Sequence, residues 1–216
     1  MSARADAAAE ARLERDWWLR VAAVILAPRA VFAALRDDSD EAARARQEPI
    51  SAIAGVAGIA GVLSTPVARH LLDDASVGTI VVAVWAFIGG AVYGVALYWA
   101  LGLLLYTAVH GLGSLGSYRR ARHMLAYAAV PVALSLLTLW PVRVAVYGSD
   151  LFRSGGADRG PGNLAFDAVN LAFAAWSLLL LVIGVRAVHG WTWPRAVAAT
   201  IAAAALPALV VLASLL

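Results

Sequence analysis

Hydrophobic residues gather in five long stretches between position 50 and the end of the sequence. They run over roughly 50–68, 79–109, 121–142, 164–185 and 195–216, and loops rich in Gly, Arg, Asp and Ser separate them. A helix needs about 20 predominantly apolar residues to cross the hydrocarbon core of a bilayer. The pattern therefore predicts an all-α fold, an integral membrane bundle of five transmembrane helices.

The second stretch, 79–109, is longer than a single crossing needs. At about 1.5 Å per residue it forms a helix of roughly 45 Å, against a hydrocarbon core of about 30 Å. Two crossings joined by a turn would need far more residues. We therefore predict one helix that tilts or projects beyond the bilayer.

The first 49 residues follow a different pattern. An Ala-rich stretch that mixes Arg with acids lacks the order of a secretory signal, so no cleavage is expected. It leads into WWLRVAAVILAPRAVFAALRDD, whose apolar part is interrupted by Pro28 and is too short to span. The apolar side chains of this region can face lipid together from a helix broken at Pro28: Trp17, Trp18, Val21, Val24, Ile25, Phe32 and Leu35. We predict an amphipathic interfacial helix pair in a cytoplasmic segment, 1–49, ahead of a membrane domain, 50–216.

The 17 basic side chains, all of them Arg, are unevenly distributed. With five spans, the amino-terminal side receives the eight arginines of residues 1–49 together with Arg119, Arg120, Arg122, Arg186 and Arg195. The other side receives Arg69, Arg143, Arg153 and Arg159. Loops that stay in the cytoplasm carry an excess of positive charge. We expect a multi-pass protein of the cell (inner) membrane, with its amino terminus cytoplasmic and its carboxyl terminus outside.

Composition excludes several other classes of protein. Hydrophobic residues make up 62% of the chain and charged residues 14%, with a mean hydropathy of +0.77, whereas soluble domains average about 45–50% and about 25%. A soluble enzyme fold, a secreted disulfide scaffold and a disordered protein are excluded. The chain has no Cys, so it has no disulfides, thiolate metal sites or Cys nucleophiles.

The order of these segments resembles a known membrane family. The surface helix reads PRAVFAAL at 28–35, Pro49 opens the first span, and GSYRRARHMLAYAAVP at 116–131 enters the third. The fourth span carries Trp176 and is followed by GVRAVHGWTWPRA at 184–196. Together these features resemble the bacterial branch of the Yip family, the Ypt-interacting membrane proteins.

The resemblance implies five spans and a cytoplasmic amino terminus, in agreement with the arginine count. Eukaryotic members are associated with small GTPases and vesicle traffic, and their acidic Asp-Leu-Tyr-Gly-Pro stretch is absent from this sequence. For bacterial members the resemblance implies no reaction and no catalytic residues.

Two candidate sites lie at the start of the third stretch. Arg119, Arg120 and Arg122 form a basic patch with no acid nearby in the sequence, suited to a partner, to anionic phospholipid or simply to anchoring the topology. Pro131 lacks an N–H, and within a helix its ring clashes with the carbonyl of Tyr127. Tyr127 and Pro131 are therefore a candidate hinge. The alternative is a kink that only shapes the packing of the helices.

A second pair of features concerns the membrane interior. Arg143, Asp167 and Asn170 lie near the outer ends of the third and fourth spans, where polar groups usually pair or face a cavity. They form either a small polar site or an ion pair at the membrane boundary. Small residues spaced four apart favour close helix packing within the bundle, or a face for another membrane protein or a second copy: Gly55, Gly58, Gly61, Gly90 and Gly94.

Catalytic and metal sites find weak support in the sequence. His110, His123 and His189 fall on the cytoplasmic side without the spacing of a helical ligand pair, so we expect solvated interfacial histidines. The run DDSDE at Asp37–Glu41 favours a capped helix start over a Mg²⁺ site. We therefore expect a protein without cofactor, metal or nucleic acid that binds or organises membrane partners in the lipid bilayer. The alternatives are a transporter accessory subunit or small-solute permease and, third, an intramembrane enzyme that uses the Asp37–Glu41 carboxylates.

Overall fold

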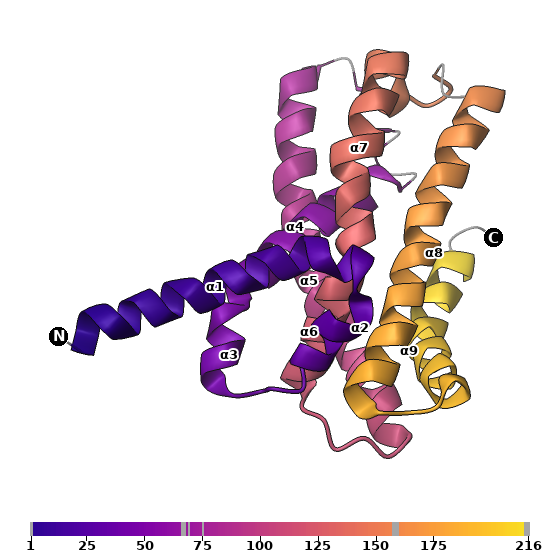
Figure 1. The fold of residues 1–216 in the computed structure, drawn as a ribbon. Helices are drawn as coiled ribbons and strands as arrows, with labels where there is room; N and C mark the ends of the chain where they lie inside the picture. Colours follow the sequence, from indigo (N-terminus) through magenta and orange to yellow (C-terminus); the bar gives the residue numbers. More distant parts are fainter. Residues whose placement is uncertain (1, 66–67, 69, 75, 157–159, 214–216) are drawn as a thin grey trace. The chain divides into compact units, whose positions relative to one another are not determined.

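The computed structural model describes residues 2–65, 68, 70–74, 76–156 and 160–213 (Figure 1). Within these ranges every regular element is helical and no strand occurs, which confirms the all-α prediction. The elements are α1 (Ser2–Leu26), α2 (Pro28–Ala34), α3 (Asp40–Ala45), α4 (Gln47–Leu63), α5 (Thr79–Gly111), α6 (Tyr118–Ala128), α7 (Val130–Tyr147), the 3₁₀ helix η2 (Gly148–Phe152), α8 (Pro161–His189) and α9 (Trp193–Ala213). Arg69 and Arg159 of the charge count, and the ends of two predicted stretches at 66–67 and 214–216, lie outside the described residues.

The chain divides into two compact units, which we describe separately. One comprises Met1–Ala52, Tyr98–Ala128 and Leu178–Leu216, and we call it the terminal unit. The other comprises Ile53–Leu97 and Ala129–Ser177, and we call it the central unit.

Three helical segments among the described residues are long and apolar enough to cross a membrane. They are Thr79–Gly111 with 33 residues, Tyr118–Phe152 with 35 and Pro161–His189 with 29. α4 is equally apolar in character but has only 17 residues, or about 25 Å of helix. The described residues therefore contain three candidate membrane-spanning helices, as expected of a membrane protein, while the count of five stays a prediction.

The surface of α5 supports a lipid environment. Large apolar side chains along its central-unit part are exposed, among them Ile80, Trp85 and Val92 at 80%, 68% and 65%. A contiguous apolar surface of this kind is unusual on a protein that lies in water. Such a face is suited to contact with the hydrocarbon of a lipid bilayer.

The amino-terminal helices use their apolar side chains differently from the prediction. The chain breaks at Ala27, and Pro28 stands in the first turn of α2 as expected. However, Trp17, Val24, Phe32 and Leu35 are at most 2% exposed, because α1 packs on α2, α3 and α6 within the terminal unit. A Cβ added at Gly184 would lie 2.8 Å from Cε1 of Phe32, so the Phe32 ring packs directly against this glycine. The prediction that this face meets lipid was wrong for these four residues.

The predicted third span is interrupted at one residue. α6 ends at Ala128 and α7 begins at Val130, with Pro131 in its first turn. A helix start tolerates proline because the first N–H groups have no partner inside the helix. The interruption is confined to Ala129, and the helical segment as a whole runs from Tyr118 to Phe152, so the kink at Tyr127 and Pro131 stays a prediction.

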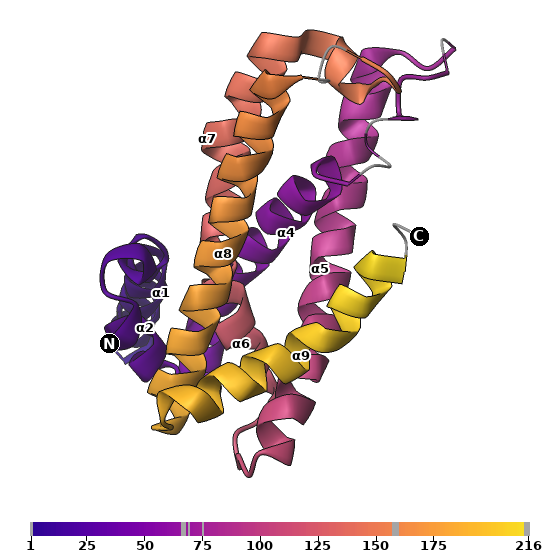
Figure 2. The same cartoon turned by 90° about the vertical axis from the view of Figure 1, so that its right-hand side faces the viewer.

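α4 and α5 approach each other backbone to backbone in the central unit (Figure 2). A Cβ added at Gly58 would lie 2.5 Å from Gly94 N, and one added at Gly90 would lie 2.7 Å from the Cα of Ile59. Only glycine fits at such a distance. Of the other predicted packing residues, Gly55 has room for a Cβ at 3.9 Å from Ala91 Cβ, and Gly61 meets nothing within 4 Å.

Replacing Gly58 with Ala should force the two helices apart. Overpacking of this kind typically costs about 1–3 kcal/mol, so we expect a clearly lower melting temperature for the purified protein in detergent. Gly61→Ala is the matched control on the same helix and should leave the melting temperature unchanged or slightly raised. Equal effects of the two substitutions would show that the close crossing does not determine stability.

Candidate functional site

A completely buried arginine stands at the centre of the terminal unit. α3 is a six-residue helix whose first turn is capped by Ser39, which accepts a hydrogen bond from the N–H of Ala42 at 3.3 Å. Arg46 directly follows the helix as its C-cap residue and has no exposed surface. The sequence predicted a capped helix start within Asp37–Glu41, and Ser39 is the residue that caps it, which leaves the Asp38 carboxylate free for other partners.

Arg46 joins three segments of the chain. Its Nε donates to Nδ1 of His123 at 2.7 Å, its Nη1 to the carbonyl of Asp37 at 2.7 Å, and its Nη2 to Oδ1 of Asp38 at 3.1 Å. Burial lowers the pKa of Arg46, and the Asp38 carboxylate opposes that shift. A buried guanidinium is tolerated only when partners replace its lost hydration. This constraint fixes the positions of α6 and the 37–39 segment around α3.

The carboxylate of Asp38 is shared with the basic patch of α6. Arg119 donates from Nε to Asp38 Oδ1 at 3.1 Å and from Nη2 to the Asp38 carbonyl, and Ser117 donates to Oδ2. Arg120 lies 3.9 Å from Oδ2. The third donor of Arg119, Nη1, reaches Asp40 Oδ1 at 2.7 Å. The patch that lacks acids in the sequence therefore has two of them in the fold, 79 and 81 positions away.

Arg122 has a separate environment in the same unit. Its guanidinium carbon lies 3.5 Å from the ring centre of Trp99, 4.7 Å from that of Tyr118 and 5.3 Å from that of Tyr98. Such stacking is a favourable cation–π arrangement. Arg122 is thus occupied by aromatic rings, whereas Arg119 and Arg120 are engaged with the acidic segment.

Tyr127, proposed as part of a hinge, anchors α1. Its hydroxyl donates to the carbonyl of Trp17 at 3.3 Å, and the two rings lie 5.8 Å apart. The guanidinium groups of Arg20 and Arg46 lie 4.1 Å and 5.4 Å from the Trp17 ring centre. A buried hydroxyl, an aromatic pair and two cations therefore hold α1 against α6.

The histidines are not arranged as a metal site. His123 is 1% exposed, so the expectation of a solvated side chain was wrong, and it lies against Arg46 instead. His189 Nδ1 lies 3.1 Å from the Ser114 hydroxyl, and His110 stacks on Tyr106. Across the described part of the chain, no three His, Cys, Asp or Glu side chains are grouped to hold a metal ion.

The central unit brings together two of the three residues of the predicted polar site. Arg143, only 3% exposed, lies 3.3 Å from the Asp167 carboxylate. Asn163, which the sequence analysis missed, completes the cluster by accepting from Arg143 at 2.5 Å and donating to Asp167 at 2.8 Å. Asn170 points elsewhere and donates to the Ser64 hydroxyl at 3.2 Å. Asn163 stands one helical turn before Asp167, and this spacing was the available signal.

A further polar cluster ties two loops of the central unit together. Ser154 donates to the carboxylate of Asp73 from its backbone N–H at 2.8 Å and from its hydroxyl at 2.6 Å. These bonds, with one from His70, hold the pKa of Asp73 at about 2. Ser154 and Asp73 both meet Nδ1 of His70, so the imidazole does not relay between them as it does in a catalytic triad.

The comparisons with known proteins give the class of protein. The family model described as Yip1 domain matches residues 22–215, which is nearly the whole chain. The protein therefore belongs to the Yip1 domain family, as the sequence pattern predicted. No curated protein and no solved structure matches the chain.

Replacing Arg46 with Met should undock the amino-terminal helices, since Asp38 and His123 would lose a buried partner. Breaking a buried charged pair typically costs about 3–5 kcal/mol. We expect a lower melting temperature and rapid tryptic cleavage at Arg29 and Arg36 in the purified protein. Arg44→Met, on the exposed side of the same helix, should change neither. Unaltered cleavage in the Arg46 variant would contradict the anchoring role.

Proposed function

We propose that the protein is a bacterial, five-span member of the Yip1 family in the cytoplasmic membrane. In this arrangement α4, α5, the α6–α7 segment, α8 and α9 are the spans, and α1 to α3 lie at the cytoplasmic surface. The family assignment over residues 22–215, the exposed apolar face of α5 and the excess of arginine on one side support this proposal. The amino terminus is then cytoplasmic and the carboxyl terminus outside.

We further propose that it acts without catalysis, by binding or organising membrane partners at its cytoplasmic face. The observation that carries this proposal is the set of hydrogen bonds made by the acidic segment. Asp38 accepts from Arg46 and Arg119, and Asp40 accepts from Arg119. Carboxylates engaged in this way hold helices together instead of holding a metal or moving a proton. The face they build, with Arg119, Arg120 and Arg122, is the proposed binding surface for another membrane protein, a second copy or lipid.

A second candidate function is that of a small-solute permease or transporter accessory subunit. The Arg143, Asn163 and Asp167 cluster favours it, because charged groups within membrane helices often mark a path for polar solutes. The break at Ala129 keeps Tyr127 and Pro131 as a candidate hinge in either function.

The proposed topology can be tested by cysteine labelling, because the native chain has no Cys. Leu115 is 98% exposed and should face the cytoplasm, whereas exposed Arg153 should face outward. In intact cells an impermeant maleimide should label Arg153→Cys and leave Leu115→Cys unlabelled until the cells are opened. Labelling of both variants, or the reverse pattern, would contradict the five-span orientation.

The binding role can be tested by capture in mild detergent. Native mass spectrometry of the tagged protein should show a defined membrane partner or a second copy. Arg120→Gln should lower the recovery of that species several-fold, since Arg120 belongs to the proposed surface, where it lies 3.9 Å from Asp38 and donates to the carbonyl of Arg36 at 2.9 Å. Arg29→Gln, an exposed arginine on α2, is the control and should not lower it. Equal recovery from both variants would contradict a role for this surface, and a hydrolytic activity that requires Asp37 or Glu41 would favour the enzyme alternative.

A further inference from the structure

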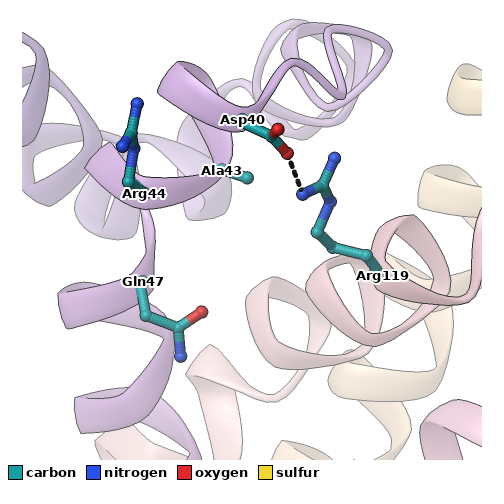
Figure 3. A pocket seen from close by; sticks show the side chains of 5 residues that line it. All are labelled: Asp40, Ala43, Arg44, Gln47 and Arg119. Atoms are coloured by element: carbon teal, nitrogen blue, oxygen red, sulfur yellow. Dashed lines mark hydrogen bonds and ion pairs between the residues drawn. The ribbon is translucent and has the colours of Figure 1, made fainter.

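A pocket opens between α3, the start of α4 and α6 in the terminal unit. Its volume is about 340 Å³, and it is lined by Asp40, Ala43, Arg44, Gln47 and Arg119. Figure 3 shows Arg44 and Gln47 on one side, Asp40 and Arg119 on the other, and the small side chain of Ala43 between them. The volume is room for roughly ten waters at about 30 Å³ each, and hence for a phosphate group with a small organic substituent.

The lining has an excess of positive charge. Arg44 and Arg119 contribute two positive charges, and Asp40 contributes one negative charge. Among the residues whose side chains the structure describes, Arg44 is exposed and has no hydrogen-bond or ion-pair partner. Every basic residue of this chain is Arg, so the residue type itself carries no information. The informative observation is that two arginines, Arg44 and Arg119, line the same pocket.

Unlike a free surface arginine, Arg119 is held in one orientation by hydrogen bonds to its partners. Asp38, with a side chain only 12% exposed, fixes its Nε and Nη2 from one side. The remaining donor, Nη1, faces Asp40, whose side chain is 84% exposed. Exposed ion pairs contribute only about 0–1 kcal/mol. An incoming anion can therefore replace Asp40 at Nη1 without disturbing the Asp38 contacts.

We propose that this pocket binds a phosphate monoester, held between Arg44 and Nη1 of Arg119 with the amide of Gln47 as a further donor. A phosphate monoester presents three acceptor oxygens and about two negative charges, which suits two guanidinium groups on opposite walls. The inference rests on the proposed binding role of the face that carries Arg119, and it adds the chemical class of the ligand. That group can belong to a lipid headgroup or to a soluble compound.

Two probes with the same chemical group distinguish these sources. The full-length protein is placed in nanodiscs of phosphatidylcholine, either with phosphatidic acid added to the lipid or with glycerol 3-phosphate added to the buffer. Both faces of a nanodisc are accessible, so the result does not depend on the orientation that the maleimide experiment tests. A ligand that binds only the folded protein raises the melting temperature, because it stabilises the folded state by RT ln(1 + [L]/Kd). Stabilisation by phosphatidic acid alone assigns the pocket to a lipid headgroup, and stabilisation by glycerol 3-phosphate assigns it to a soluble compound.

Substitutions of opposite sign test the pocket itself. Arg44→Gln should weaken binding roughly tenfold, as expected for the loss of a charge-assisted hydrogen bond, while the exposed Arg29→Gln should have little effect. Asp40→Asn removes the internal competitor and should tighten binding, whereas Glu41→Gln, an adjacent exposed acid outside the pocket, should change it much less. The proposal is overturned if neither probe stabilises the protein, or if each pocket variant behaves like its control.

Discussion

The buried guanidinium of Arg46 is the constraint on which the terminal unit depends. An arginine without exposed surface must replace its hydration with partners, and here these come from α6, from the 37–38 segment and from the ring of Trp17 on α1. None of these segments can satisfy the charge alone. The amino-terminal helices therefore dock as a group, which explains why Trp17, Phe32 and Leu35 lie inside the protein rather than on its surface.

The central unit is held by different forces. Between helices in lipid there is no hydrophobic driving force, so close van der Waals contact becomes the main attraction. The contact of Gly58 with Gly90 and Gly94 meets this requirement by removing side chains from the crossing. The ion pair of Arg143 with Asp167 meets the other requirement of the membrane, which is that a charged group must have a compensating partner.

Local sequence patterns predicted the features that local sterics determine. Residues within a few positions of one another are enough to predict the apolar stretches, the break before Pro28 and the close packing at Gly58, Gly90 and Gly94. The charged core could not be predicted in this way, because Arg46 and His123 are 77 positions apart. In the sequence, Arg46 belongs to the charged amino-terminal segment, and His123 follows the basic patch and was expected to be solvated. Only the fold shows that the two side chains are buried and hydrogen-bonded to each other.

The ion pair between Asp40 and Arg119 makes the Asp40 carboxylate an internal competitor of any anion that binds to Arg119. Asp38, which is fixed on Arg119, is only two residues before Asp40, so the Asp40 carboxylate is tethered within reach of Arg119. A group tethered in this way acts like a free ligand at an effective concentration on the order of millimolar. Any external anion must reach a comparable local density before it occupies the same nitrogen. If the proposed phosphate monoester is a lipid headgroup, its confinement to the membrane surface supplies that density at a small bulk concentration, whereas a soluble phosphate monoester must supply it from the buffer.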